Sequence, residues 1–497
     1  AHPVRPDSFV EINNFYTATV YEKGAELIAM LKMLVGDEAY YRALDLYFER
    51  HDGQAATIED WLAVFEDTTG RDLSQFKRWY EDAGTPRLTV TDTYENGTFT
   101  LHIEQSTPRT PGQDDKPARV IPIAVGLLGP NGDEVRPTEV LEMTEACQSF
   151  SFDGLAARPV PSILRGFSAP VILQRDSDNA ERAFLLAHDT DPFNKWEAGR
   201  ALARDGLLAM IRDRAAPDPA YLDAIWAVAS DERLDPAFRA LALGLPSEDD
   251  LAQTLHDAQI TPDPQVIWQA LEDLRDARAA RMESAARTLY DTHQVHAPYA
   301  PNAEQSGSRS LANAALGMIT RRDGGAAARK QFETSTNMTQ QLAALSCLVQ
   351  AGAGDDAVAA FYDQWRHDRL VVDKWFSLQV LNARPETAAA TAEKLTQHPD
   401  FSMKNPNRFR ATLGALAGNA AGFHHASGAG YELMATWLIR LDALNPQTAA
   451  RMSTAFETWR RYDSARQAQV MTALDQILAT DGLSQDTAEM VGRLRDG

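Results

Sequence analysis

Ala83-Gly84-Thr85-Pro86-Arg87-Leu88-Thr89-Val90-Thr91 is the stretch at which the chain changes from one kind of secondary structure to another. Glycine and proline commonly end a helix, and the residues ahead of them recur at helical spacing. The residues after them alternate between apolar and polar, which is the pattern of a half-buried strand. Glu95-Asn96-Gly97 then supplies a hairpin turn, and Phe99 to Glu104 alternates back. The stretch therefore predicts a boundary between a helical segment and a β domain near residue 84.

Upstream of this boundary, the sequence has the pattern of several amphipathic helices. Between residues 14 and 34 the apolar positions recur every three or four residues, which gives one buried face. Residues 38–48 form a second such stretch, and Leu73 to Tyr80 a further one. Thr57-Ile58-Glu59-Asp60 has the form of a capping box and predicts a helix start. We expect residues 1–84 to be the helical tail of a larger domain.

Downstream, the pattern predicts a β domain and then a long helical one. Residues 85–178 contain about seven short strand-like runs separated by turn signals, residues 163–167 among them, which is typical of a small β-sandwich. Residues 179–497 are helical again, with short polar or proline-containing breaks. So many helices without strands cannot share one compact core, so stacked helix pairs in a superhelical, solenoid-like domain are expected. The expected fold is multidomain and mainly α.

Composition narrows the class of protein. A length of 497 residues corresponds to about two to four domains, and 44% hydrophobic with 24% charged residues is ordinary for a soluble globular protein. The net charge of −22 argues against a nucleic-acid partner and favours cationic or neutral ligands. The longest apolar run, residues 120–128, is far shorter than the roughly 20 residues of a membrane helix. We therefore expect no membrane insertion.

The cysteines and the first residues bear on compartment and completeness. Cys147 and Cys347 cannot form a disulfide framework, which favours a reducing compartment, although a single bridge between them stays open. We expect a cytoplasmic monomer. The chain opens with Ala-His-Pro and with no basic and apolar leader, so we expect a sequence that starts inside a longer protein.

The histidines do not form a recognisable metal motif. None of the eleven is followed directly by glutamate, so the zinc motif H-E-x-x-H is absent. Two pairs, His293 with His296 and His424 with His425, lack a third clustered ligand, and we interpret them as surface or loop residues. Glycine-rich phosphate loops and the G-x-S-x-G nucleophile motif are absent as well. The sequence therefore predicts no metal-binding residues in this chain.

The first helical stretch contains Val20-Tyr21-Glu22-Lys23-Gly24-Ala25. Tyr16 and Tyr21 on a helix are commonly core or boundary residues whose hydroxyl groups find a backbone partner. Gly24 inside a helix costs about 1 kcal/mol relative to alanine, which indicates a close approach of another segment or a kink. These features alone do not indicate an enzyme.

This motif resembles the tyrosine motif that follows the zinc site in aminopeptidase N-type zinc metallopeptidases. The resemblance to the bacterial branch of that family extends, in order, over essentially the whole chain. It is carried by Arg5-Pro6-Asp7, Asn13-Asn14-Phe15-Tyr16-Thr17, residues 46–53, Arg78-Trp79-Tyr80, Gly84-Thr85-Pro86, residues 372–376, Asn405-Pro406-Asn407-Arg408 and Arg461-Tyr462-Asp463.

The resemblance implies roles for individual residues. Tyr21 would donate a hydrogen bond to the oxyanion that forms when water attacks the scissile carbonyl, and a phenol suits this because it is a neutral donor at neutral pH. Tyr16 would line the pocket for the first side chain of the substrate. Trp375, Arg408 and Arg410 would face the internal cavity of the helical domain and contact substrate, with salt bridges or helix caps as the competing interpretation.

The resemblance also implies what this chain lacks. The zinc ligands, the general-base glutamate and the segment that holds the free amine of the substrate precede the tyrosine in the family and are absent from the 497 residues. Residues 1–84 would then be the end of a thermolysin-like catalytic domain. The intact parent would bind zinc and remove N-terminal residues from peptides, while this chain alone would bind no metal and be inactive. Two alternatives stay open: a non-catalytic, solenoid-type peptide-binding or scaffolding protein, and an enzyme reconstituted from two chains.

Overall fold

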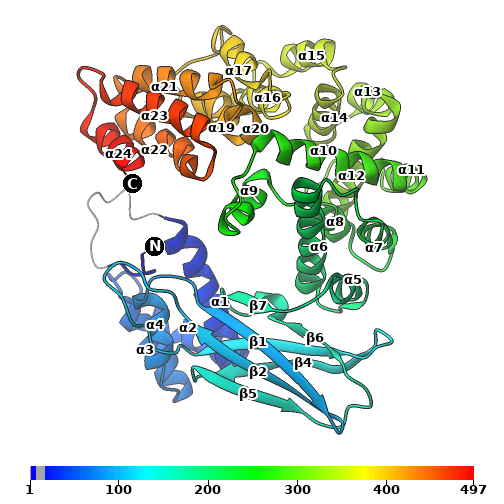
Figure 1. Cartoon of the computed structure of the whole chain (residues 1–497), viewed down its shortest axis with the longest axis vertical. Coiled ribbons are helices and arrows are strands. Elements are labelled where there is room, and N and C mark those ends of the chain that lie inside the picture. Colours follow the sequence, from blue (N-terminus) through cyan, green and yellow to red (C-terminus); the bar gives the residue numbers. More distant parts are fainter. Residues whose placement is uncertain (1, 7–16, 497) are drawn as a thin grey trace. The chain divides into compact units, whose positions relative to one another are not determined.

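A computed structural model of the chain describes residues 2–6 and 17–496 (Figure 1). It divides into two compact units, Ala1–Gly199 and Arg200–Gly497. The first unit contains the helical segment, the β domain and the start of the helical region that follows. The second unit contains the remaining helices.

The first unit opens with short helices whose ends follow local sequence signals. The described helices ahead of the β domain are η2 (Thr19–Lys23), α1 (Gly24–Val35), α2 (Asp37–His51), α3 (Ile58–Thr69) and α4 (Ser74–Glu81). The predicted start at Thr57 is confirmed, because its side chain accepts a hydrogen bond from the Asp60 backbone N–H and Asp60 bonds back to the Thr57 N–H. Gly70 ends α3 with a φ of 70°, a left-handed conformation that favours glycine.

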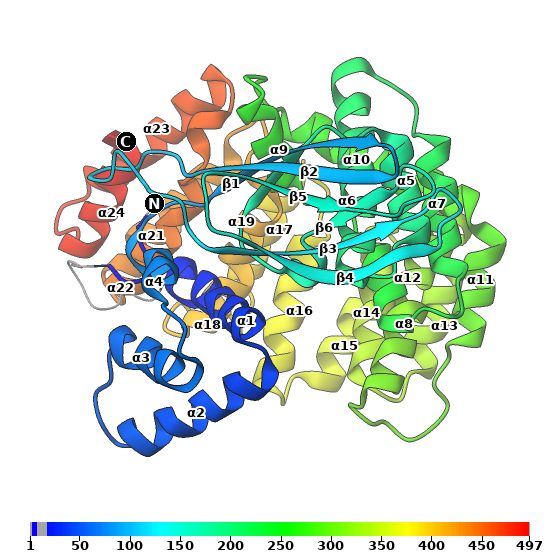
Figure 2. The ribbon, with the colours of Figure 1, turned by 90° about the horizontal axis from the view of Figure 1, so that it is seen from below.

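Two sheets follow the helical segment. Their strands are β1 (Arg87–Glu95), β2 (Thr98–Ser106), β3 (Ile121–Leu128), β4 (Glu134–Met143), β5 (Cys147–Phe152), β6 (Val160–Ile163) and β7 (Ile172–Arg175). One sheet has the order β5-β2-β1-β7 and the other β4-β3-β6, and Figure 2 shows the strands of both running alongside each other. The predicted hairpin turn joins β1 to β2 through Asn96 and Gly97, both at positive φ.

The predicted strand over residues 163–167 is wrong beyond Ile163. There the chain leaves the sheet through Leu164, at φ 63°, into a short 3-10 helix, η3 (Arg165–Phe167). This turn directs the Arg165 side chain inward, where it ion-pairs with Glu134 at 2.6 Å and with Asp189 at 3.0 Å. The guanidinium lies against Gly126 of β3, where an added Cβ would be 2.1 Å from Arg165 Cζ. Gly126 is therefore required by the buried arginine.

The helical segment and the β domain share a single hydrophobic core. Buried side chains of α1, α3 and α4 form one cluster with those of both sheets, including Ile121, Ile123, Val125 and Leu127 of β3. Trp79 of α4 is fully buried and donates its indole N–H to the Val120 carbonyl at 2.8 Å. Packing across residue 84 is thus continuous, and it explains why the two segments belong to one compact unit.

In the rest of the described chain, every regular element is a helix. After α5 (Asn179–His188) and α6 (Pro192–Asp213), helices adjacent in sequence pack against one another, for example α11 on α12 and α13 on α14. They are α7 (Pro219–Ser230), α8 (Pro236–Ala242), α9 (Glu248–Asp257), α10 (Pro264–Arg281), α11 (Glu283–Thr292), α12 (Ala303–Asp323), α13 (Ala326–Thr334), α14 (Met338–Gln350), α15 (Asp355–Trp365), α16 (Arg369–Leu381), α17 (Ala388–Thr396), α18 (Pro406–Phe409), η4 (Arg410–Gly414), α19 (Ala415–Gly418), α20 (Ala420–Phe423), α21 (Ala429–Asp442), α22 (Pro446–Met452), η5 (Ser453–Phe456), η6 (Trp459–Arg461), α23 (Ser464–Leu478) and α24 (Gln485–Asp496).

Candidate active site

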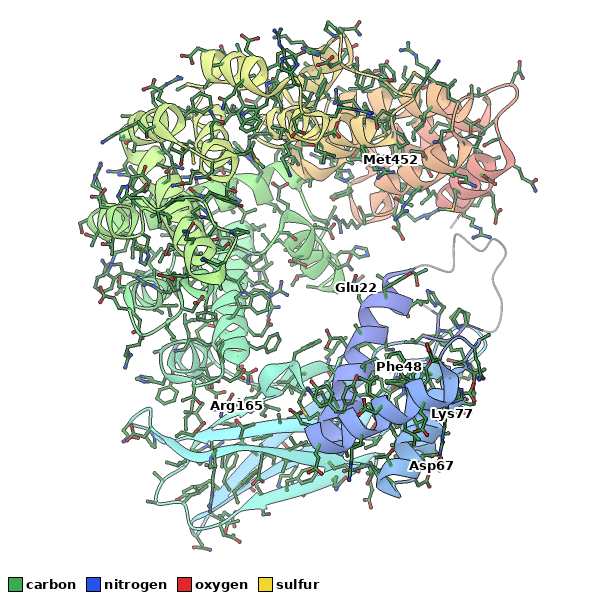
Figure 3. All side chains as sticks on the ribbon, turned by 180° about the vertical axis from the view of Figure 1, so that it is seen from behind. Glu22, Phe48, Asp67, Lys77, Arg165 and Met452 are labelled. Atoms are coloured by element: carbon green, nitrogen blue, oxygen red, sulfur yellow. The ribbon has the colours of Figure 1, made fainter. Side chains whose placement is uncertain are left out.

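Tyr21 lies on a turn of π-helix at the start of the first helix. The five residues of η2 precede α1, and the Tyr21 backbone N–H reaches back to the Thr17 carbonyl at 3.1 Å. All five are at least partly exposed, and Tyr21 is 59% exposed. Glu22, its neighbour, marks the tip of this helix in Figure 3. Because π-turns insert a residue and re-aim side chains, they often mark functional positions. The side chain of Tyr21 is therefore exposed at the surface, which excludes a role in the core.

Gly24, the residue at which π-helix gives way to α-helix, does not mark a close approach. Its φ of −59° is helical, and an added Cβ would meet Val4 Cγ1 at 3.7 Å, an ordinary contact. Of the two expectations for this glycine, a close approach is not found among the described residues. The irregularity in the helix lies immediately before it.

Lys23 joins this turn to the start of the β domain. Its Nζ donates to the Gly84 carbonyl at 2.8 Å and lies 5.7 Å from the centre of the Trp79 ring. Burial lowers the pKa of Lys23 to about 8, and the positive charge of Arg119 acts in the same direction. Sequence reasoning quoted Lys23 within the motif but gave it no role, because its partner lies 61 residues further on.

A surface hollow of about 890 Å³ lies along α1. Val20, Gly24 and Ile28 form one side of it, with Trp61 and Tyr80 opposite. Burial raises the pKa of Tyr80 to about 12, so its phenol is neutral throughout the physiological range. The hollow is mainly apolar. None of the five residues Val20, Gly24, Ile28, Trp61 and Tyr80 has a side chain that ionises near neutral pH.

Across residues 2–6 and 17–496, no group of three or more His, Cys, Asp or Glu is placed to hold a metal ion. The described residues therefore do not fit a zinc site. His424, expected at the surface or in a loop, lies in the turn after α20 but is only 4% exposed, and its Nδ1 is 2.9 Å from the Tyr431 hydroxyl. Burial lowers its pKa to about 3, so it stays neutral. Cys147 and Cys347 are both free.

The predicted substrate residues of the helical unit differ in accessibility. Trp375 is 6% exposed and donates its indole N–H to the Val358 carbonyl at 2.8 Å. Arg408 is 5% exposed and ion-pairs with Asp373. Arg410 is exposed at the first position of η4. A substrate role stays a prediction for all three, and Tyr16 lies outside the described residues.

The helical unit also contains a polar cavity of about 500 Å³ that sequence reasoning missed. Its charged lining includes Arg321, which pairs with Glu272 at 2.8 Å and with Asp276 at 2.7 Å. Glu248 lines it as well, and burial raises the pKa of that carboxyl. These residues come from separate helices, and no local motif predicts that they meet.

Comparison with known proteins finds matches along essentially the whole chain. The family described as "Peptidase family M1 domain" matches residues 1–80, an Ig-like fold family (DUF3458) matches residues 84–176, and a family of ARM repeats (DUF3458_C) matches residues 179–496. Aminopeptidase N of Caulobacter vibrioides is 42% identical over 505 residues, and aminopeptidase N of Escherichia coli K12 is 38% identical over 512. Each alignment covers 99% of this chain and 58% of the relative.

The chain belongs to the aminopeptidase N (M1) family. The crystal structure of Legionella pneumophila aminopeptidase A in complex with aspartic acid agrees with this, with a TM-score of 0.87 at 29% identity over 100% of this chain and 58% of that one. The predicted fold class is confirmed: the end of an M1 domain, an Ig-like β domain and a large helical ARM-repeat domain.

This aminopeptidase N family chain spans about 58% of the length of the relatives it matches. Within the described residues, no helix is both long enough and apolar enough to cross a membrane. The tyrosine turn falls in the part that matches the M1 domain, while the predicted residues Trp375, Arg408 and Arg410 fall in the part that matches ARM repeats.

Proposed function

We propose that this chain is part of a zinc aminopeptidase that removes the N-terminal residue from peptides, with Tyr21 as hydrogen-bond donor to the reaction's oxyanion. Membership of the aminopeptidase N family over 99% of the chain carries this proposal. The exposed position of Tyr21 on η2 supports it, because the donor must be accessible to a substrate that arrives from solvent. Zinc belongs, in this proposal, to the intact parent enzyme.

The phenol suits this role for an electrostatic reason. Charge develops on the carbonyl oxygen only as the tetrahedral intermediate forms, so a neutral donor held in place interacts more strongly with the transition state than with the substrate. Removing such a donor costs about a hundred- to a thousandfold in rate.

The test is a chimera in which this chain follows the upstream part of the Caulobacter aminopeptidase N, assayed with an alanine anilide. Tyr21→Phe should lower kcat by about a hundred- to a thousandfold. Tyr41→Phe, which alters another exposed tyrosine of the same unit, should keep the parent rate. Equal rates for the parent and Tyr21→Phe would contradict the role of Tyr21.

The chain alone should take up no zinc and hydrolyse no aminoacyl anilide. The absence of a metal-binding group among the described residues supports this expectation. Turnover by the purified chain, measured against the same chain treated with a chelator, would overturn the proposal that the parent supplies the zinc site.

The proposal extends to peptide binding, location and assembly. Tyr16, Trp375, Arg408 and Arg410 are proposed to contact substrate, and Arg410 is the first to test because it is exposed. Arg410→Ala in the chimera should raise KM and leave kcat unchanged. A cytoplasmic monomer is proposed, supported by two free cysteines.

The second candidate is a non-catalytic peptide-binding or scaffolding protein. The polar cavity of the helical unit favours it, since a solenoid can bind peptides without a catalytic centre. Peptide binding by the chain alone, together with an inactive chimera, would favour this candidate over the enzyme.

A further inference from the structure

We propose that Lys23 is a positioning residue for Tyr21: its ammonium anchors the π-turn that carries the phenol to the junction between α4 and β1. The proposal rests on the proposed function, because it assigns Lys23 to a donor whose catalytic role is itself proposed. The geometry that carries it is a single hydrogen bond to the backbone and the rigid surface beneath it.

The anchor point is a backbone carbonyl. Lys23 is the last residue of η2, two positions after Tyr21, and its Nζ donates to the Gly84 carbonyl at 2.8 Å. Gly84 lies between α4 and β1 and has a φ of 88°, so substitution there would strain the backbone. A bond to the main chain at a fixed bend holds the turn at one distance from the β domain.

The surface beneath the anchor is part of the core. Lys23 Nζ and Arg119 Cζ lie 5.7 Å and 4.9 Å from the centre of the Trp79 ring, which is fully buried. Trp79 is itself fixed by its hydrogen bond to Val120. The π-turn is thereby connected to packed side chains of the β domain, whereas the Tyr21 side chain projects outward from it.

The surroundings of Lys23 disfavour its positive charge, so keeping a lysine there costs free energy. This cost favours a functional reason for the lysine. The charged groups around Lys23 are Arg119 and Lys116, which disfavour its protonated form, and Asp82, which favours it. Burial opposes the charge as well, and the pKa of Lys23 falls to about 8. A partly buried cation near two others is retained here although an apolar side chain would avoid the cost.

Lys32 is the matched control on the same helical segment. It also lies over aromatic rings, 4.9 Å from the centre of Tyr41, but it pairs with Asp37 and does not reach Gly84. Replacing Lys32 removes a lysine of α1 without loosening the anchor.

Hydrogen exchange of the 497-residue chain tests the anchor without any activity. Lys23→Met should speed exchange over residues 18–24 by about tenfold or more, with β3 unchanged, because the turn opens locally. Lys32→Met should leave residues 18–24 unchanged, and Lys23→Arg, which keeps a cationic donor, should restore part of the protection. The proposal would be overturned if residues 18–24 of Lys23→Met exchanged at the wild-type rate, or if exchange were accelerated equally throughout the first unit.

A second measurement is made on the wild-type chain, so it does not depend on how the Lys23 variants fold. With ¹³C-labelled tyrosines, the Tyr21 ring signal, identified by its loss in Tyr21→Phe, should shift between pH 6.5 and 9 with the midpoint of Lys23. A Tyr21 signal that ignores this titration would overturn the proposal.

The chimera separates the two proposals. Lys23→Met should lower kcat by about ten- to a hundredfold with KM unchanged, because a misplaced hydrogen-bond donor stabilises the transition state less. If Tyr21→Phe keeps the full rate while exchange behaves as expected, the catalytic role of Tyr21 fails. If Tyr21→Phe loses the rate but Lys23→Met changes neither exchange nor kcat, positioning by Lys23 is overturned.

Discussion

Two π-helical turns lie within the described residues, η2 in the first unit and η4 in the second, and they have the same length and opposite surroundings. In η4, Ala411, Thr412 and Leu413 are buried, and the Thr412 hydroxyl donates to the Arg408 carbonyl at 3.0 Å. In η2 every residue is at least partly exposed, and the turn is tied to its unit through Lys23. The same backbone irregularity is packed into the core in one place and lies at the surface in the other, where Lys23 bonds to the main chain of Gly84.

The difference shows what each turn can do. A turn fixed by packing on several sides contributes to stability and exposes little, so substitutions within it change folding. A turn at the surface keeps its exposed side chains accessible to other molecules, so substitutions of those side chains should change chemistry more than stability. The comparison therefore predicts opposite responses to mutation in the two turns.

The largest effect is expected beside η4. Arg408→Met removes the partner of Asp373, whose side chain is only 17% exposed, and breaking such a pair costs about 3–5 kcal/mol in unfolding free energy. Urea unfolding followed by circular dichroism measures this. Arg410→Met, at an exposed position two residues on, should change stability by less than about 0.5 kcal/mol. Equal losses in the two variants would contradict the contrast between the turns.

Within η4, Leu413→Ala should cost about 2–5 kcal/mol, because it leaves a cavity at a fully buried position. The counterpart in η2 is Glu22→Ala, which removes an exposed side chain and should change stability by less than about 0.5 kcal/mol. Thermal or urea unfolding of both variants provides the comparison. A stable Leu413→Ala variant would show that η4 is not held by packing.

The anchor of η2 predicts a pH dependence. Folding lowers the pKa of Lys23 from 10.5 to about 8, so between these values the unfolded chain binds more protons and stability rises with pH. The contribution of this group is at most about 3 kcal/mol. Urea midpoints from pH 7.5 to 9.5 should rise more steeply for wild type than for Lys23→Met. The same loss of slope in Lys32→Met would contradict the assignment to Lys23.

The smallest effect is expected at Tyr21 itself. Tyr21→Phe should leave the unfolding free energy within about 0.5 kcal/mol of wild type, because the side chain is 59% exposed. Tyr431→Phe, by comparison, removes a buried hydroxyl bonded to His424 and should cost about 1–2 kcal/mol. A destabilised Tyr21→Phe would indicate a structural role for that phenol.

Much of the fold could be predicted from local patterns. Gly84-Thr85-Pro86 and the alternation after it mark the change from helix to strand, and Thr57 marks a helix start, because both signals lie within a few residues. The strand expected over residues 163–167 failed for a non-local reason. Arg165 turns inward to reach Asp189, and alternation of apolar residues does not record such a partner.

The candidate site was predicted only in part, for similar reasons. Tyr21 could be singled out because the motif around it resembles a family. Its π-helical backbone could not be predicted, because π- and α-helical turns contain the same residue types over so short a stretch. The bond from Lys23 to Gly84 and the pairs of Arg321 in the polar cavity join distant residues that carry no shared local signal.

The core that runs across residue 84 has a consequence for how the protein comes apart. A boundary that is clear in the sequence is not a weak point in the fold, since Trp79 is buried against the strands beyond it. The tyrosine helix and the Ig-like domain should therefore melt together, as one cooperative step. Recombining this chain with relatives would best preserve the turn of Tyr21 when the crossover falls outside residues 17–199.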